Sequence, residues 1–282
     1  MIDKIGFFHF VEESTYAEPM TALREAIKKR PEGYVNESLI VLPEGFNIGG
    51  PYMRNKPGLR PNTDPIILFN LQELCRDFKF SLVAGLIVNM PNGPDPPYSS
   101  AYLINSDGFG LLCHKRCGDE TGIGGQRLHI GYESNYTCCS DGCDAHNAFL
   151  YRDSAIVSLM CMDAYTDGVD KPEENRQCHQ RLRNALDGFS NSAVRIVCVP
   201  AHMQYGSDTL AMQWPNSFVI LANRCHAPLT GPGSFVAQVQ AGLPGQSRIV
   251  QKWHEADNEN VVKVLGVETR RTTIGTFTGL LS

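Results

Sequence analysis

Three short segments each place a reactive side chain at the end of an apolar run, and this arrangement limits what the chain can fold into. Glu44 follows 39–43, Lys115 comes just after 109–113, and Cys161 follows 156–160. Such runs are typical of buried strands, and α/β proteins build active sites where strand ends meet at one edge of a sheet. The sequence therefore predicts an α/β fold in which these three side chains converge.

The three side chains form a set that suits attack on a carbon–nitrogen bond. A thiol is a good nucleophile once it is deprotonated, a carboxylate can take its proton, and an ammonium stabilises the negative charge on the attacked group. Each residue also has a plainer interpretation. Cys161 fits a buried core cysteine, Glu44 a surface carboxylate at a strand–loop junction, and Lys115 a solvated lysine.

Strands and helices alternate along the rest of the chain. Hydrophobic periodicity predicts helices over 17–30, 64–78 and 172–186. The predicted strands cover 5–10, 38–42, 81–88, 100–105, 109–113, 149–151, 155–160, 195–199, 217–222, 247–251 and 261–267. The last two are expected as a closing hairpin or as sheet-edge strands. The pattern predicts two mixed sheets packed face to face with helices outside, and it leaves a doubly wound sheet open.

A hairpin is expected to deliver Lys115. Strands 100–105 and 109–113 are joined through Ser106–Asp107–Gly108. Asp-Gly readily takes the positive φ that tight strand turns require.

Composition excludes several classes of protein. The net charge of −5 offers no basic field for nucleic acid. No stretch approaches 18 uninterrupted apolar residues, so no membrane span is expected. The apolar start, 1–10, contains Asp3 and His9 and is too short for a signal peptide, so we expect a first core strand there. The 282 residues contain no linker or repeat. We therefore expect one domain, 1–282, in a soluble, cytoplasmic protein.

The ten cysteines predict neither a disulfide framework nor a metal centre. Such frameworks belong to small secreted chains, and several of these cysteines lie inside apolar strands, so most are expected to be reduced and buried. The short spacings of Cys138, Cys139, Cys143 and His146 are compatible with zinc, but a second half-site is missing. An ordinary loop is favoured, and no metal or organic cofactor is expected.

The order Glu44, Lys115, Cys161 and the residues around each of them resemble the nitrilase superfamily of carbon–nitrogen hydrolases. The resemblance rests on Pro43 before Glu44, on Lys115 after the hairpin, and on Asp163 two residues after Cys161. Further support comes from Glu-Ser-Asn at 133–135 and from Val-Ile-Leu-Ala-Asn-Arg at 219–224. Together these anchors cover most of the chain.

The resemblance implies a fold and a set of roles. The fold would be a four-layer α-β-β-α sandwich of two mixed sheets with outer helices, which often pair with another subunit to give a homodimer or higher homo-oligomer. Cys161 would be the nucleophile, Glu44 the general base and later acid, and Lys115 the partner of the oxyanion. Glu133 would be the second glutamate, which orients the lysine and the substrate. Glu120 competes for that role, although its polar turn needs no catalytic explanation.

The turn after Cys161 and the surrounding pocket supply further candidates. The backbone N–H of Met162 is a natural oxyanion donor, and Asp163 is expected to fix that turn through its own backbone contacts. Tyr165, His202 and Trp214 are candidate substrate-binding residues. A structural role is the plainer interpretation for each of these three.

The resemblance implies an amidase that acts on a small amide or carbamoyl compound through a thioester acyl-enzyme. The residues of segments 164–168 and 212–216 differ from those common in the family, so the resemblance does not define the substrate. A basic loop with Arg54, Lys56 and Arg60 is compatible with an acidic substrate. The alternatives are nitrile hydrolysis to the acid by the same site, a non-catalytic partner-binding protein that retains the fold, and a zinc-dependent hydrolase that uses the 138–146 cluster.

Overall fold

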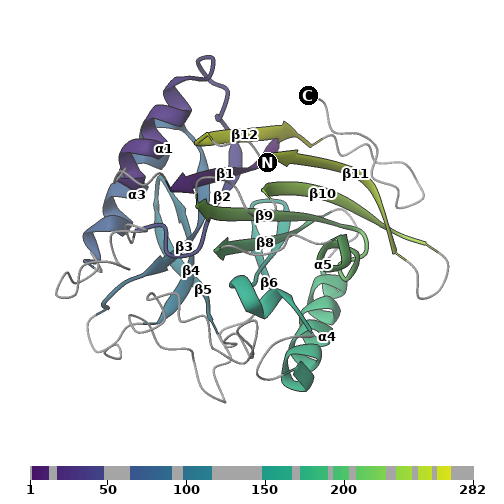
Figure 1. Cartoon of the computed structure of the whole chain (residues 1–282). Helices are drawn as coiled ribbons and strands as arrows, with labels where there is room; N and C mark the ends of the chain where they lie inside the picture. The colour runs from purple at the N-terminus through teal and green to yellow at the C-terminus, as the bar shows by residue number, and fades with distance from the viewer. Residues whose placement is uncertain are drawn as a thin grey trace.

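The protein has an α/β fold with one large, curled, mixed sheet and few helices (Figure 1). The computed structural model describes residues 2–12, 18–47, 64–90, 98–115, 148–166, 172–189, 193–202, 208–226, 233–242, 247–255 and 259–267. Within these ranges no helix is long and apolar enough to cross a membrane.

The observed elements follow the predicted ones closely. The helices are α1 (Pro19–Lys28), α3 (Ile66–Phe78), α4 (Pro172–Gly188) and α5 (Asp208–Met212), with a 3₁₀ helix, η2 (Cys161–Ala164). The strands are β1 (Lys4–Glu12), β2 (Ser38–Leu42), β3 (Ser81–Ile87), β4 (Ser99–Asn105), β5 (Gly108–His114), β6 (Ala148–Tyr151), β7 (Ser154–Ser158), β8 (Val194–His202), β9 (Ser217–His226), β10 (Ser234–Ala241), β11 (Ser247–Glu255) and β12 (Val261–Gly266). Of these strands, β10 is the one that the periodicity did not predict.

The described strands join into a single sheet with the main order β5-β4-β3-β2-β1-β9-β8-β7-β6; off this path, β10 pairs with β9 and β11, and β12 pairs with β1. Strand β1 links the two halves, because Lys4–Phe7 pairs with β2 whereas Phe10–Glu12 pairs with Arg224–His226 of β9. Strands β1, β2 and β3 run parallel, as do β7, β8 and β9. The parallel strands therefore bring their carboxyl ends, with the residues that follow them, to common edges of the sheet.

The two C-terminal strands do not pair with each other, so the expected closing hairpin is wrong. Strand β11 pairs with β10, and β12 pairs antiparallel with β1. The alternative expectation, sheet-edge strands, is confirmed: each of the two pairs with one other described strand. The periodicity shows that a segment is a strand but does not identify its neighbour.

The hairpin between β4 and β5 has the predicted position but a different turn. Its two loop residues are Ser106 and Asp107, and neither Asp107 nor Gly108 has a positive φ. The turn is closed instead by Asn105, whose Oδ1 accepts from the N–H of Asp107 at 2.8 Å and from the N–H of Gly108 at 3.1 Å. The Asn105 side chain thus stabilises the turn that a positive φ in Asp-Gly was predicted to form.

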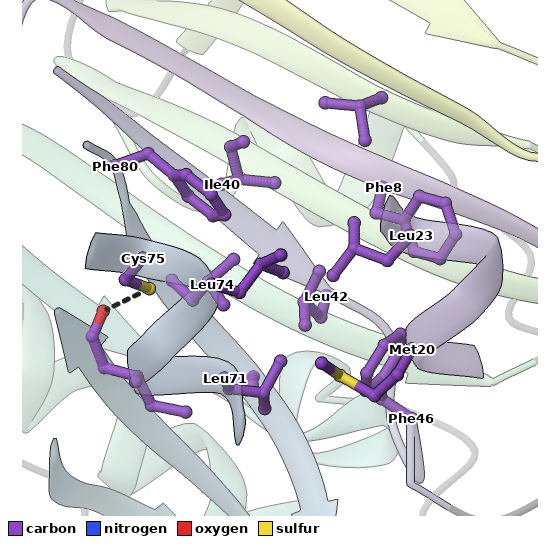
Figure 2. Packing of buried hydrophobic residues seen from close by; sticks show 14 of the residues in the cluster. Phe8, Met20, Leu23, Ile40, Leu42, Phe46, Leu71, Leu74, Cys75 and Phe80 are labelled. Atoms are coloured by element: carbon purple, nitrogen blue, oxygen red, sulfur yellow. Dashed lines mark hydrogen bonds between the residues drawn. The ribbon is translucent and has the colours of Figure 1, made fainter. Parts of the chain in front are cut away.

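Alternating strand residues divide the core between two faces of the sheet. Ile40 and Leu42 of β2 point toward α1 and α3 and pack with Leu23 and Leu71 (Figure 2). The intervening residues of β2 belong to a second cluster, which also takes members from β7, β8 and β9. This cluster lies between the two halves of the sheet, because β2 contacts both β8 and β9.

A third cluster lies between β7–β10 and helices α4 and α5. Figure 1 accordingly shows α1 and α3 on one side of the molecule and α4 and α5 on the other. The three clusters are compatible with the predicted four-layer sandwich, which remains a prediction. For the site, the important result is that the ends of β2 and β8 come close together.

Candidate active site

Glu44 lies on a tight loop after β2 that packs between the two halves of the sheet. Its side chain is 1% exposed. Its N–H donates to the Ala201 carbonyl on β8 at 3.3 Å. Gly85 of β3 permits this approach, because a Cβ there would lie 2.7 Å from the Glu44 Cα and 2.7 Å from the Pro200 Cβ. A glycine in the neighbouring strand therefore allows the carboxylate to enter the interior.

Lys115 forms a buried ion pair with Glu44. Its Nζ lies 3.1 Å from the Glu44 Oε1, and the two side chains are 5% and 1% exposed. The same oxygen accepts from the Ser99 Oγ at 2.9 Å, and the Lys115 N–H donates to the Ser99 carbonyl at 2.8 Å. Ser99 thus fixes both partners. A buried charge pair that is also hydrogen-bonded holds its geometry firmly, because either charge alone would be costly there.

Cys161 begins η2, three residues after the end of β7 at Ser158, and has a left-handed backbone. Its φ is +49°, a conformation that costs a non-glycine residue about 1–3 kcal/mol. The residue is 3% exposed, and its thiol donates to the His202 carbonyl at 3.9 Å. Strained backbone of this kind gathers at functional sites, where the surrounding structure holds it in place.

The environment of the thiol keeps it protonated at neutral pH. Burial is the main cause and raises the pKa of Cys161 to about 12. The charge of Glu44 and a hydrogen bond to its carboxylate also raise this pKa, whereas Lys115 lowers it. The structure therefore places one buried ion pair, Glu44 and Lys115, within electrostatic reach of the Cys161 thiol.

The turn around Asp163 is fixed through its backbone, as expected. Its N–H donates to the Met160 carbonyl at 2.9 Å. Its carbonyl accepts from the Asn175 Nδ2 at 2.9 Å and the His179 Nε2 at 2.6 Å, both on α4. Met162 lies within this turn, and its role as an oxyanion donor stays a prediction.

Arg224 supports the loop that carries Glu44. This fully buried residue at the end of β9 donates from Nη1 to the Gly45 carbonyl at 2.5 Å. Its guanidinium lies 5.3 Å from the centre of the Phe10 ring. Burial lowers the pKa of Arg224 to about 9. In the β8–β9 register Arg224 is opposite His202. It therefore lies between the Glu44 loop and the His202 carbonyl, which accepts the hydrogen bond of the Cys161 thiol.

The candidate pocket residues occupy different positions. Tyr165 is half-buried, and burial raises the pKa of its phenol; the Cys161 thiol adds to this rise, which places the phenol near the thiol. His202 meets the thiol through its carbonyl. Trp214 is fully buried, and its ring lies 5.2 Å from that of His179. This contact assigns Trp214 to the core beside α4, and its role in the pocket stays a prediction.

Several candidates fall outside the described residues. These are Glu133, Glu120, the cluster of Cys138, Cys139, Cys143 and His146, and the basic loop of Arg54, Lys56 and Arg60. In the part of the chain that the structure describes, no group of three or more His, Cys, Asp or Glu side chains could hold a metal ion. Five described cysteines are buried and form no disulfide, which confirms for them the prediction of reduced core thiols: Cys75, Cys113, Cys161, Cys178 and Cys198.

Supporting residues of the site escaped the sequence patterns. Ser99 gives no signal, since a serine at the start of a strand is ordinary. Asn175 and His179 do carry one: they are four residues apart in α4, on the face that buries Cys178, Leu182 and Leu186. Polar residues within an apolar helical stripe require internal hydrogen-bond partners.

Comparison with solved structures shows which known proteins share this fold. An amidase from Nesterenkonia sp. is similar with a TM-score of 0.58 and 15% identity, covering 94% of this chain and 90% of that one. A variant of the Nesterenkonia AN1 amidase, described as from the nitrilase superfamily, has a TM-score of 0.58 and 15% identity, covering 95% of this chain and 92% of that one. Another variant carries acrylamide, added at its active-site cysteine. Its TM-score is 0.57 and its identity 15%, and the match covers 93% of this chain and 92% of that one.

Comparisons of the sequence itself with known proteins do not make this link. No protein-family model matches it, and no curated protein does so either. At 15% identity the likeness to the solved structures concerns the fold. The chain has the fold of the amidases of the nitrilase superfamily.

Proposed function

We propose that the chain is a member of the nitrilase superfamily and a cysteine-dependent hydrolase of carbon–nitrogen bonds. Its substrate would be a small amide or carbamoyl compound. The observation that carries this proposal is the buried ion pair of Glu44 and Lys115, which acts electrostatically on the Cys161 thiol. A base, a cation and a nucleophile in one interior location are the parts that acyl transfer through a thioester requires.

The first stage forms the acyl-enzyme. Glu44 takes the proton of Cys161 as the sulfur attacks the carbonyl carbon. The negative charge that develops on the carbonyl oxygen is stabilised by Lys115 and by the backbone N–H of Met162. The amine then leaves with the proton held by Glu44, and a thioester remains on the sulfur.

The second stage releases the acid. Glu44 removes a proton from water, and the resulting hydroxide attacks the thioester carbon. The sulfur leaves and regains a proton, which restores the resting thiol. We assign Glu133 to orienting Lys115 and the substrate.

The resting thiol suits this order of events. Because the pKa of Cys161 is raised to about 12, a free thiolate is scarce at neutral pH. The Glu44 carboxylate, which acts electrostatically on the thiol, instead takes the proton as the sulfur attacks. Lys115, already neutralised by Glu44 in the resting pair, becomes available to the oxyanion once Glu44 is protonated.

We extend the proposal to the molecule as a whole. The three core clusters support a four-layer α-β-β-α sandwich. We propose a single carbon–nitrogen hydrolase domain over 1–282 that works in the cytoplasm as a homodimer or higher homo-oligomer, with no nucleic-acid or membrane partner.

The test is a panel of small amides, carbamoyl compounds and nitriles, with intact-mass detection of a covalent intermediate. We expect acid release from an amide or carbamoyl compound and an acyl adduct that is lost in Cys161→Ala. Cys75→Ala is the matched control, because burial likewise raises the pKa of Cys75 to about 12, but Cys75 lies in the cluster beneath α3. Turnover of nitriles alone would favour the nitrilase alternative. No turnover and no adduct with any compound would favour a non-catalytic binding protein.

A further inference from the structure

Two side chains of helix α4 hold in place the turn that carries Cys161. Asn175 and His179 both donate to the carbonyl of Asp163, at 2.9 and 2.6 Å, and Asn175 also donates to the carbonyl of Tyr165. The two side chains are 1% and 0% exposed. Being four residues apart, they lie on the same face of the helix and reach the turn together.

The turn needs such support because it is strained. Cys161 has a φ of +49°, and η2 is a single 3₁₀ turn of four residues. A strained segment keeps one conformation when its surroundings over-determine it. Two buried donors on one carbonyl fix the peptide plane after Asp163, and with it the path of a turn that begins at the nucleophile.

The hydrogen bonds of His179 determine which ring nitrogen carries its proton. The Asp163 carbonyl can only accept, so Nε2 must donate to it. Burial lowers the pKa of His179, which favours the neutral ring, and Nδ1 is then an acceptor. Nδ1 lies 3.0 Å from the Gln213 Oε1, so the amide of Gln213 must turn its nitrogen toward the ring, an orientation assigned from the network.

The far side of His179 is fixed as well. Arg183 donates to the Gln213 carbonyl at 3.1 Å, and its guanidinium lies 6.0 Å from the centre of the Trp214 ring. The Trp214 ring lies 5.2 Å from the imidazole. The imidazole therefore has little freedom to move away from the turn. Such second-layer contacts hold reacting groups within the narrow geometry that catalysis requires.

We propose that His179, together with Asn175, is a positioning residue for the nucleophile turn. It touches no reacting atom; it fixes the Asp163 carbonyl, and thereby the directions of the Cys161 sulfur and of the Met162 N–H. This inference rests on the proposed function. The hydrogen bond from Nε2 to the carbonyl carries the effect, so any side chain that places an N–H at the same point should retain it.

The test compares three substitutions at one position. His179→Gln can place its amide nitrogen near the Nε2 position, His179→Asn is too short to do so, and His179→Phe fills the space with no donor. We expect kcat to fall about 10- to 100-fold in the Asn and Phe variants, with KM changed less than about threefold. The Gln variant should stay within about threefold of the parent chain in both parameters. Gln177→Ala, on the exposed face of α4, is the matched control, because Gln177 contacts Glu173 and not the His179 network.

Two further measurements separate positioning from stability and from the proposed function. Thermal unfolding of each variant shows whether activity follows the hydrogen bond or only the folded fraction. The rate of Cys161 alkylation by iodoacetamide needs no substrate, and we expect it to fall at least about fivefold in the Asn and Phe variants but not in the Gln variant.

The outcomes are distinct. If the parent chain hydrolyses none of the compounds, the proposed function fails. If the alkylation rates of the variants nevertheless differ as expected, the positioning role stands. If His179→Asn matches His179→Gln in kcat and in alkylation, the positioning role is overturned. If His179→Phe does not fold, the Asn and Gln variants still decide the question.

Discussion

Replacement of Glu44 by Gln should make the Cys161 thiol easier to alkylate while it abolishes amide hydrolysis. The carboxylate raises the pKa of the thiol through its charge and through its hydrogen bond, and Lys115 lowers it. Gln keeps the size of the side chain and can still accept from Lys115 and Ser99, but it carries no charge and cannot take the thiol proton. One substitution therefore raises the reactivity of the nucleophile and removes its base.

The gain in alkylation can be bounded from the pKa of Cys161. Each unit removed from a pKa near 12 gives about ten times more thiolate at pH 8, and lower basicity reduces the reactivity of that thiolate about threefold, so the net gain is about three- to fourfold per unit. A full return to 9.0 would give roughly 30-fold or more. Because burial is the main cause and persists, we expect a gain of about 3- to 10-fold.

The assay is alkylation by iodoacetamide, read as intact mass with peptide mapping. Below its pKa, the alkylation rate of Cys161 should rise about tenfold per pH unit in both proteins. Cys75 provides an internal control, because its raised pKa comes from burial alone and should not respond to position 44. If Glu44→Gln slows alkylation of Cys161, or retains amide turnover, then the carboxylate is not the charge and base that the geometry assigns.

Three further substitutions test the support of the site. Lys115→Met leaves Glu44 buried without its cation and should lower the free energy of unfolding by about 3–5 kcal/mol in urea, most of which the double variant with Glu44→Gln recovers. Gly85→Ala drives a Cβ to 2.7 Å from the Glu44 backbone, so it should cost about 1–3 kcal/mol and most of the turnover, whereas Gly110→Ala, where a Cβ meets nothing within 4 Å, should change neither. Arg224→Leu leaves the Gly45 carbonyl without its buried donor and should destabilise by about 1–3 kcal/mol; an unfolding curve that matches the parent chain would refute that role.

Much of the fold could be predicted because the signals are local. Apolar runs such as 38–42 and 81–88 identify buried strands, and the positions of Met20, Leu23 and Ile27 identify the buried face of α1. Pairing is not local in this sense. Strand β10 lies between β9 and β11, and β11 and β12, next to each other in the chain, join different halves of the sheet.

For the site, the sequence by itself indicated three candidate side chains, each just past a predicted strand: a carboxylate, an ammonium and a thiol. Only the tertiary structure decided that Glu44 and Lys115 form an ion pair, that Ser99 and Arg224 support it, and that α4 holds the turn of Cys161. The physical reason is range. Strand periodicity is set by neighbours in sequence. The contacts of the site instead join residues that are 16 apart (His179 and Asp163), 71 apart (Lys115 and Glu44) or 179 apart (Arg224 and Gly45), and these meet only in the folded chain.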